Sequence, residues 1–464
     1  MVFSSLQFIL FFMPAFFICY YVFPQKCRNF ILLSGSLIFY FVGTIEKPYY
    51  LILLIIMAIM DFFIGQGMEK KPQAKKIYLA VGVFFHLACL FIFKYSSFML
   101  DEIVRIFNMK NLSMEIVLPI GISFYTFQGI SYITDVYRCK VKAEDSLLNY
   151  MVYITMFEQL IAGPIVIYGQ IRMQLQRRSI TLHKVISGLG TYMFGLGLKV
   201  LLANPLGKLW NQTLAIGFDS ISTILAWMAI FAFSFQIYLD FFGYSLMAIG
   251  LGKMLGFKLP ANFNHPYTSL TMTEFFRRWH ITLSSWFKEY VYIPLGGNRN
   301  GWLKTIRNLM IVWLLTGIWH GAGYNFLCWG FVLFVIILME KLFYGKFLTE
   351  HALLGHLYMV LMIPVTWAIF AVTDMNQLAV LFSRLFPFFG KGMWSIFRYD
   401  YLKYWKMYYP FLIIGLLFST KLPYQFLKKI KNKAVLVIFL IIVFGASLYC
   451  MYRGLDDPFL YFRF

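Results

Sequence analysis

Apolar runs of membrane-spanning length recur along the whole chain, and they constrain its fold more than any other feature. The clearest of them cover residues 4–23, 30–43, 49–66, 77–95, 114–134, 184–203, 221–251, 324–344, 352–373 and 434–452. Shorter or interrupted runs cover residues 147–166, 306–320 and 408–420. A helix needs about 20 apolar residues to cross a hydrocarbon core of roughly 30 Å, so the pattern predicts an all-α polytopic membrane protein with about 11–13 membrane segments.

Several of these runs are too short to cross a bilayer alone. Such segments are tolerated at membrane depth where protein encloses them or where they line a cavity. We therefore expect short re-entrant helices around a central tunnel. The whole chain, 1–464, is predicted to be a single membrane-embedded domain, with N-terminal spans (1–250), a core region (251–330) and C-terminal spans (331–464).

The basic residues indicate how the chain is oriented. Lysine and arginine number 41 against 20 acidic residues, a formal charge of +21, but no long basic soluble segment is present to bind nucleic acid. They gather in short loops at Lys26–Arg28, Lys70–Lys76 and Lys428–Lys433. The positive-inside rule assigns these loops to the cytoplasm, which predicts both termini outside. The six cysteines show no metal-ligand spacing, so neither a metal site nor a disulfide framework is expected.

Residues 271–292 mix aromatic and charged side chains in the pattern of an amphipathic helix or helix pair. Thr271 and Glu274 have the spacing of a capping box, which marks a helix start. One stripe at helical spacing consists of Arg277, His280, Ser284 and Lys288. Arg278 and Trp279 lie between its first two members in sequence, and Trp279 belongs to the neighbouring aromatic stripe. One interpretation is an interfacial helix; the other places His280 over a substrate path, with an arginine holding an anionic donor.

The segment Ile293–Gly301 has one proline and three glycines in nine residues, so it is predicted to be a loop. Its Gly-Gly-Asn-Arg turn includes Asn298 and Arg299. The amide N–H groups of such a turn can bind a phosphate or a sulfur atom, and the same turn is also common as plain structure.

A helix that runs from Arg307 would place His320 roughly 20 Å from its basic end, deep in hydrocarbon, just after Trp319. Gly321 and Gly323 end that helix, so the imidazole sits at its negative dipole end, which favours a proton-accepting role. The alternative is a neutral histidine bonded to a neighbouring carbonyl. By contrast, His86 has no polar residues near it in sequence and is interpreted as structural.

Gln236 and Asp240 are four residues apart on an otherwise apolar helix, so they share one face. Intramembrane carboxylates are costly and usually paired. A proton relay and helix packing through hydrogen bonds are both consistent with this spacing.

Together and in this order, these stretches resemble the membrane-bound O-acyltransferase family. The resemblance is carried by residues 1–5, Leu118–Tyr125, Ala162–Pro164, Arg277–His280, Ile318–Gly321 and Tyr461–Phe464. Within that family, Tyr292–Arg299 resembles the alginate O-acetyltransferase branch. One departure is Leu246, where that branch commonly has Asp after Gly-Tyr-Ser; leucine there is closer to the branch that passes D-alanine to teichoic acids.

The resemblance implies a catalytic His320 and an assisting His280 in a tunnel, with an acyl thioester, expected to be acetyl-CoA, arriving from the cytoplasm. It implies no tightly bound cofactor, and an exported polysaccharide acceptor with an extracytoplasmic acyltransferase partner. The residues we expect to bind substrate are Arg277, Arg278, Trp279, Ser284, Asn298, Arg299, Trp319, Gln236 and Asp240. Rival functions are D-alanyl transfer from a carrier protein, a proton-coupled transporter and a structural scaffold. The expected location is the bacterial cell membrane.

Overall fold

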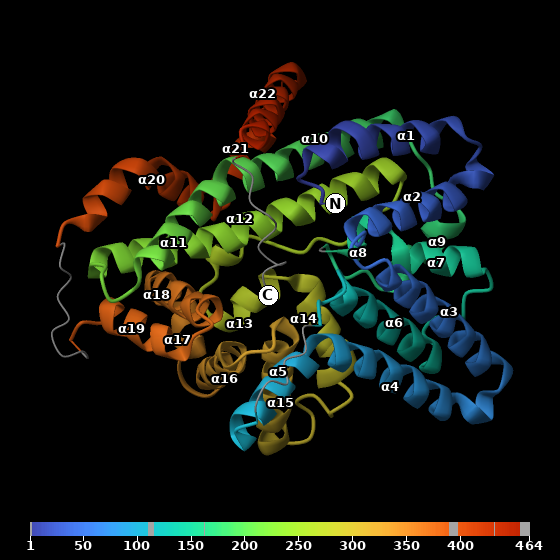
Figure 1. Ribbon diagram of the computed structural model, residues 1–464, viewed down its shortest axis with the longest axis horizontal. Helices are drawn as coiled ribbons and strands as arrows, with labels where there is room; N and C mark the ends of the chain where they lie inside the picture. Colours follow the sequence, from blue (N-terminus) through green and yellow to red (C-terminus); the bar gives the residue numbers. More distant parts are fainter. Residues whose placement is uncertain (1, 110–115, 162, 389–397, 431, 455–464) are drawn as a thin grey trace. The chain divides into compact units, whose positions relative to one another are not determined.

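The computed structural model describes residues 2–109, 116–161, 163–388, 398–430 and 432–454. Within these ranges the chain consists of helices and contains no strand (Figure 1), which confirms the all-α prediction. Met1, Ala162 and Tyr461–Phe464, which contribute to the family resemblance, lie outside the described residues.

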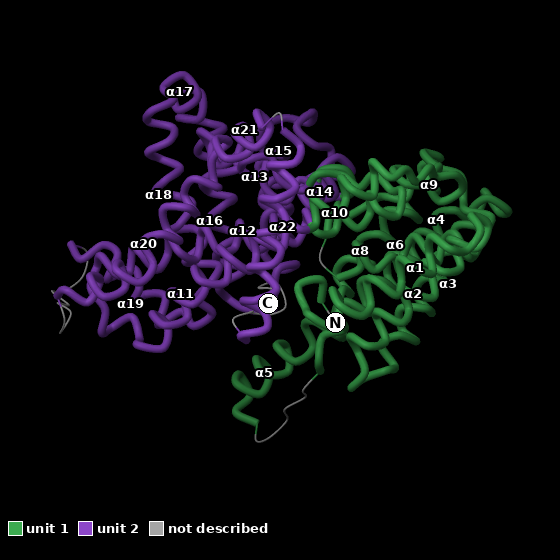
Figure 2. Tube along the Cα trace, turned by 90° about the horizontal axis from the view of Figure 1, so that it is seen from above, with its two compact units in different colours: residues 1–192, 247–261, 288–290 green, residues 193–246, 262–287, 291–464 purple. Residues whose placement is uncertain are grey.

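The chain forms two compact units, which Figure 2 shows in different colours. The first comprises residues 1–192, 247–261 and 288–290, and the second comprises residues 193–246, 262–287 and 291–464. Helices of the first unit are α1 (Met13–Val22), α2 (Arg28–Gly43), α3 (Tyr49–Lys70), α4 (Lys75–Lys94), α5 (Ser96–Phe107), α6 (Ile122–Tyr137), α7 (Leu147–Thr155), α8 (Phe157–Leu160) and α9 (Tyr168–Gln176). Two helices are shared between the units, α10 (Leu182–Gly197) and α12 (Thr223–Leu255). The single membrane-embedded domain stays a prediction.

The second unit holds the helices that carry both histidine motifs. Its helices are α11 (Asn204–Ile216), α13 (Met272–Arg278), α14 (Ile281–Phe287), α15 (Trp302–His320), α16 (Tyr324–Met339), α17 (Gly345–Glu350), α18 (Ala352–Ala371), α19 (Met375–Leu385), α20 (Asp400–Phe418), α21 (Leu422–Lys429) and α22 (Lys433–Tyr452). Short π-helical turns η4 (Leu198–Ala203) and η7 (Glu340–Tyr344) join α10 to α11 and α16 to α17.

Seven helical stretches in the described ranges are long and apolar enough to cross a membrane. They are Tyr49–Lys70, Pro72–Lys94, Leu182–Ile216, Thr223–Leu255, Tyr324–Glu350, Ala352–Ala371 and Lys433–Tyr452. The pair α20 and α21, bent by 74°, makes an eighth if it is one broken span. Other predicted segments form shorter helices, such as Phe8–Val22. The chain is therefore a multi-pass membrane protein.

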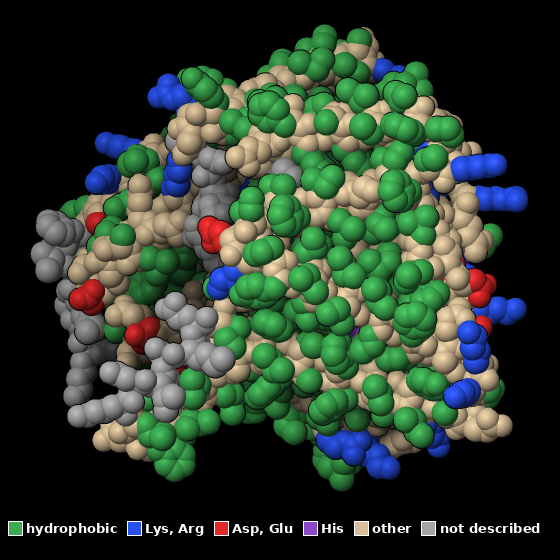
Figure 3. Space-filling view, turned by 45° about the vertical axis from the view of Figure 1, so that its right-hand side comes forward, with side chains coloured by type: hydrophobic (Ala, Val, Ile, Leu, Met, Phe, Trp, Pro, Cys, Tyr) green, Lys and Arg blue, Asp and Glu red, His purple; other side chains and the backbone are tan. Residues whose placement is uncertain are grey.

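The outward side chains of these helices are apolar. Phe84 and Ile77 on α4 are 74% and 67% exposed, and similar side chains line α3 and α22. On the face drawn in Figure 3, hydrophobic side chains are spread over much of the surface, and most of the visible lysines and arginines lie near its margins. Such a surface suits contact with lipid, which offers no hydrogen bonds to polar groups.

In the first unit, α3, α4 and α6 pack around a buried polar pair. His86 Nε2 lies 2.8 Å from Asp61 Oδ1, and the Tyr150 hydroxyl donates to Asp61 Oδ2 at 3.2 Å. Gly129 leaves room for this pair, because a Cβ there would overlap both side chains. His86 is thus held by a partner on another helix, 25 residues earlier in the chain, which local sequence did not reveal.

In the second unit, α15 and α16 form a tight hairpin and lie side by side in Figure 1. Gly317 on α15 faces Gly330 on α16, and neither position has space for a side chain. A Cβ on Gly330 would lie 2.5 Å from the carbonyl oxygen of Trp313, and a Cβ on Gly317 would overlap the carbonyl oxygen of Phe326. This close approach fixes the end of α15, where His320 lies.

Candidate active site

His280 lies at a break between two helices. Helix α13 ends at Arg278 and α14 begins at Ile281, which confirms the predicted helix pair. His280 adopts a left-handed backbone with φ 42°, an uncommon conformation for a residue with a side chain. Its carbonyl accepts the backbone N–H of Ser284 at 3.1 Å, so it opens the second helix. The prediction of one continuous stripe through Arg277, His280 and Ser284 is therefore wrong, because the helical register is interrupted at His280.

The imidazole of His280 is 2% exposed and is held by Asn262 from the segment before α13. Its Nδ1 lies 3.1 Å from Asn262 Oδ1. The same oxygen accepts the backbone N–H of Thr282 at 3.3 Å and its hydroxyl at 2.9 Å. Burial lowers the pKa of His280 to about 3, so its ring is neutral at physiological pH. Nothing in the local sequence points to Asn262, since it lies 18 residues away from His280.

The start of α13 is anchored by a buried carboxylate. Glu340, 4% exposed on η7, accepts the backbone N–H groups of Met272 at 2.6 Å and Thr273 at 2.8 Å. The hydroxyls of Thr273 and Tyr358 also donate to it, at 2.6 Å and 3.0 Å. Thr271 caps the same helix turn, accepting the backbone N–H of Glu274 at 3.1 Å. The predicted cap is confirmed, and Glu340 is a second anchor that sequence reasoning missed.

His320 is the last residue of α15, as the following glycines predicted. Helix α15 has 19 residues, so His320 lies about 27 Å from the loop that precedes it. Gly321 follows directly, and a Cβ there would overlap the ring of Phe326. His320 is 7% exposed, so its imidazole is enclosed by protein.

Aromatic rings enclose both histidines. Trp319 contacts both imidazoles, with ring centroids 6.1 Å from His280 and 4.9 Å from His320. The His320 ring also meets Trp329 at 5.1 Å and Phe370 at 5.0 Å. Trp367 on α18 completes the enclosure, with its ring 6.0 Å from Trp329 and 4.9 Å from Trp279. The second unit thus brings together both predicted histidines with the predicted Trp279 and Trp319.

The remaining predicted site residues between positions 277 and 284 are Arg277, Arg278 and Ser284. Arg278 pairs with Glu274 and donates to the Thr268 hydroxyl at 3.0 Å. The hydroxyl of Ser284 donates to the carbonyl of Phe276 at 2.9 Å. Arg277 is exposed. Arg278 therefore has structural partners, and Arg277 is the more exposed of the two arginines.

Gln236 and Asp240 meet helices on another side of α12. Lys199, on the π-helical turn η4, pairs with Asp240 at 2.7 Å, and the two side chains are 1% and 4% exposed. Gln236 packs against Gly207 on α11, where a Cβ would overlap its amide. The structure therefore gives Asp240 a cationic partner, and that pairing favours a packing role for this carboxylate.

The glycine-rich loop is held by its own hydrogen bonds. The amide of Gly297 donates to the carbonyl of Tyr292 at 2.9 Å, and that of Arg299 donates to the carbonyl of Gly296 at 3.3 Å, which supports the plain structural interpretation of the turn. The side chains of Asn298 and Arg299 are exposed. Asn308 fastens the loop to α15 by donating to the carbonyl of Gly297 at 2.8 Å.

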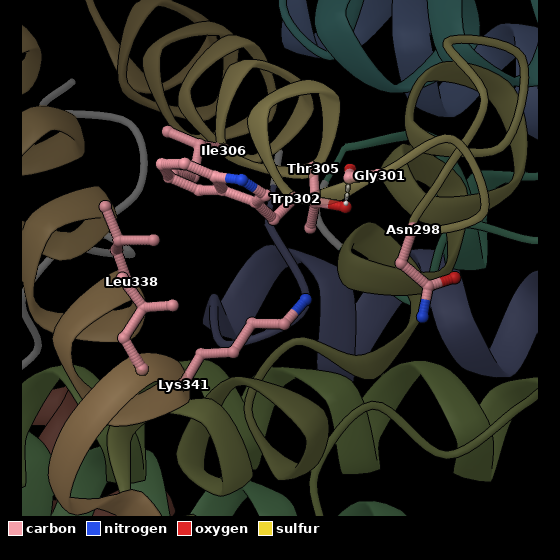
Figure 4. A pocket seen from close by; sticks show the side chains of 8 residues that line it. Asn298, Gly301, Trp302, Thr305, Ile306, Leu338 and Lys341 are labelled. Atoms are coloured by element: carbon pink, nitrogen blue, oxygen red, sulfur yellow. Dashed lines mark hydrogen bonds between the residues drawn. The ribbon is translucent and has the colours of Figure 1, made fainter.

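Beside this loop is a cavity of about 300 Å³, near the start of α15. It is lined by Asn298, Gly301, Trp302, Thr305, Ile306, Leu338, Lys341 and Leu342. Figure 4 shows the ammonium of Lys341 between the side chains of Trp302 and Asn298. A mainly apolar pocket with one cation can hold an organic anion.

Comparison with known proteins assigns this architecture to a class. The model of the membrane-bound O-acyltransferase family matches residues 37–373. The probable alginate O-acetylase AlgI of Pseudomonas aeruginosa is 36% identical over 405 residues, which cover 85% of this chain and 76% of that protein. A peptidoglycan O-acetyltransferase of Helicobacter pylori is 34% identical over 367 residues, covering 71% and 68%. A teichoic acid D-alanyltransferase of Bacillus subtilis is 27% identical over 222 residues, covering 46% and 56%.

A helical multi-pass membrane protein with these similarities is a membrane-bound O-acyltransferase. The chain belongs to the membrane-bound O-acyltransferase family. This confirms the resemblance and the enzyme class expected from the sequence motifs, and it disfavours the transporter and the scaffold.

Proposed function

We propose that this chain moves an acetyl group from a cytoplasmic thioester across the membrane toward an exported polysaccharide, with His320 as general base. One observation carries the proposal: a buried histidine ends α15 inside an aromatic enclosure that also contains a second histidine. An enclosure of this kind excludes water, which would otherwise hydrolyse the thioester. The names of the similar proteins, an alginate O-acetylase and a peptidoglycan O-acetyltransferase, support acetyl as the acyl group and a polysaccharide as the acceptor.

The chemistry follows from general base catalysis. A ring nitrogen of His320 takes the proton of the acceptor hydroxyl while the hydroxyl oxygen attacks the carbonyl carbon of the thioester. The carbon–sulfur bond then breaks, and the proton passes from His320 to the departing thiolate. A neutral imidazole is required at the start, and an ester and a free thiol are the products.

The donor side of the proposal rests on the loop end of α15. Lys341 lines the apolar cavity there, and Arg299, Lys304 and Arg307 are exposed in the stretch of chain that supplies its other wall. Cations beside an apolar pocket suit the phosphates and the pantetheine arm of acetyl-CoA. We propose that the donor enters here and that its acyl end reaches His320 along α15. No tightly bound cofactor is part of this scheme.

We further propose that the enzyme lies in the bacterial cell membrane with both termini outside. The basic loops at Lys26–Arg28, Lys70–Lys76 and Lys428–Lys433 support this orientation. The acceptor then lies outside, where an extracytoplasmic acyltransferase is the proposed partner. Single cysteines introduced into these loops should be labelled by a membrane-impermeant maleimide only after the membrane is opened.

The test of the proposed function in cells is the acetyl content of the surface polysaccharide. We expect His320→Ala to abolish it at unchanged protein level in the membrane fraction. His351→Ala is the matched control, because His351 is exposed just before α18 and its side chain meets Phe347 on α17, with a 3.0 Å hydrogen bond to the carbonyl and a ring contact. Acetylation that persists in His320→Ala overturns the catalytic assignment.

A second candidate function is D-alanyl transfer toward teichoic acid from a carrier protein. Leu246 favours it, and the similarity to a teichoic acid D-alanyltransferase supports it over 46% of this chain. The two functions differ in donor, so purified enzyme given labelled acetyl-CoA or a D-alanyl carrier separately distinguishes them.

A further inference from the structure

Asn262 occupies a central position beside His280. It is 1% exposed and lies in the segment between α12 and α13. Its backbone carbonyl accepts the N–H of Ile281 at 2.9 Å, and its side-chain oxygen meets His280 and Thr282. Asn262 therefore contacts both residues that follow the break and the imidazole itself.

The hydrogen bonds to Asn262 determine which nitrogen of His280 carries the proton. The backbone N–H of Thr282 can only donate, so the atom it meets at 3.3 Å is the amide oxygen of Asn262. The Nδ1 of His280 lies 3.1 Å from that same oxygen. Two acceptors do not form a hydrogen bond, so Nδ1 carries the hydrogen. The neutral ring then has its lone pair on Nε2.

The unprotonated nitrogen is buried without a partner. Among the described residues, no group forms a hydrogen bond with His280 Nε2. The neighbours of the ring are aromatic, with Phe241 at 4.7 Å and Trp319 at 6.1 Å between ring centroids. A buried acceptor in apolar surroundings is costly unless something donates to it. No donor for Nε2 is therefore found within the part of the chain that the structure describes.

We propose that Asn262 is a positioning residue that fixes His280 in the Nδ1–H tautomer, so that Nε2 accepts a hydrogen bond from an acceptor hydroxyl next to the one that reacts. This rests on the proposed acyl transfer. A thioester carbonyl cannot donate to Nε2, whereas a hydroxyl can. His280 thereby orients the acceptor, and the reacting hydroxyl keeps its own proton for transfer to His320.

The backbone of His280 supports the same division of roles. A left-handed conformation persists at a residue with a side chain only when its surroundings hold it. Asn262 supplies that restraint by bonding to the ring, to Ile281 and to Thr282. Replacing Asn262 with an apolar residue therefore affects the tautomer of His280 and the restraint on its backbone together. A second variant is needed to separate these two effects.

The experiment uses three variants of the full-length protein in lipid nanodiscs. Asn262→Leu removes the acceptor oxygen at similar volume. Asn262→Asp keeps an oxygen acceptor for Nδ1–H. Ser245→Ala is the matched control, because Ser245 accepts only the weak 3.4 Å bond from the amide nitrogen of Asn262. Each variant is measured for kcat, for the KM of the acetyl donor and of a soluble sugar acceptor, and by ¹⁵N NMR of labelled histidine.

In the wild type we expect a ¹⁵N signal of a neutral Nδ1–H imidazole, assigned by its loss in His280→Gln. We expect Asn262→Leu to lose this tautomer signal, to lower kcat at least tenfold and to raise the acceptor KM, while the donor KM is unchanged. Asn262→Asp should restore the signal and much of kcat, and Ser245→Ala should resemble the wild type.

Two results overturn the inference. One is a wild-type His280 signal of the Nε2–H tautomer or of imidazolium. The other is a normal kcat in Asn262→Leu, or a kcat in Asn262→Asp that is as low as in Asn262→Leu although both variants are folded. The tautomer readout needs no turnover, so an inactive wild type with the expected signal refutes the proposed acyl transfer and leaves the assigned tautomer intact.

Discussion

The carboxylate of Glu340 accepts the backbone N–H of Met272 at 2.6 Å and so ties η7 to the first turn of α13. Helix α13 has only seven residues, and His280 follows its end by two. A helix this short has little stability of its own, so its position depends on contacts at its ends. Glu340 at one end and Asn262 at the other together hold the His280 segment.

Replacing Glu340 with alanine should destabilise the protein and lower activity together. The change leaves one buried and one part-buried backbone N–H group without an acceptor, which costs about 2–3 kcal/mol. We expect a clearly lower midpoint of thermal unfolding in detergent. Glu350→Ala is the matched control, because Glu350 is 57% exposed and makes only a 3.7 Å pair with Lys346. Equal midpoints for the two variants would contradict the anchoring role.

The contact between α15 and α16 should tolerate no added side-chain atoms. Gly317→Ala and Gly330→Ala place a methyl group against backbone carbonyls, which must move apart at a cost of about 1–3 kcal/mol. Because this contact positions His320, we expect kcat to fall together with thermal stability. Gly445→Ala on α22 is the control, since a Cβ there meets no atom within 4 Å. Normal activity in Gly317→Ala would show that the hairpin does not set the position of His320.

The Lys199–Asp240 pair should behave as a structural unit and not as a proton relay. Removing one partner leaves a buried charge, at a cost of about 3–5 kcal/mol, whereas replacing both with apolar residues is close to neutral. We expect Lys199→Met and Asp240→Leu each to reduce the yield of folded protein, and the double variant to recover both folding and acyl transfer. A well-folded double variant without activity would instead favour the proton relay.

The buried neutral His280 should make the protein less stable in mild acid. Its pKa is lowered to about 3 in the folded state and is about 6.5 in the unfolded chain, so the unfolded state binds the extra proton between these values. Stability is therefore fully present above about pH 6.5 and falls by up to about 1.4 kcal/mol per pH unit below it. The midpoint of thermal unfolding should fall from pH 7 to pH 5 more steeply in the wild type than in His280→Gln. Parallel slopes would exclude a buried neutral His280.

The parts of the site that lie on one stretch of sequence could be predicted. His320 follows a long apolar run and precedes Gly321, so both its burial and its place at the end of a helix follow from local pattern. The cap at Thr271 depends on a residue three positions away and was also predictable. The apolar runs similarly predicted helices α3, α12 and α16, because length and hydropathy decide such helices.

The parts that depend on distant residues could not be predicted. The break at His280 is held by Asn262 and, through α13, by Glu340, which lies 68 residues after Met272. Lys199 pairs with a carboxylate 41 residues away, and nothing in either segment alone indicates the other. Helical periodicity through residues 277–284 therefore suggested a continuous stripe, whereas tertiary hydrogen bonds interrupt it.

The central claim is that His320 transfers an acyl group, and transfer by the purified enzyme tests it most directly. The enzyme is reconstituted in liposomes with [¹⁴C]acetyl-CoA outside and a soluble oligosaccharide enclosed, and ester-linked label is counted on the oligosaccharide. We predict that the wild type and His351→Ala transfer label, and that His320→Ala transfers less than a hundredth as much. Transfer by His320→Ala at a rate close to that of the wild type would contradict the account.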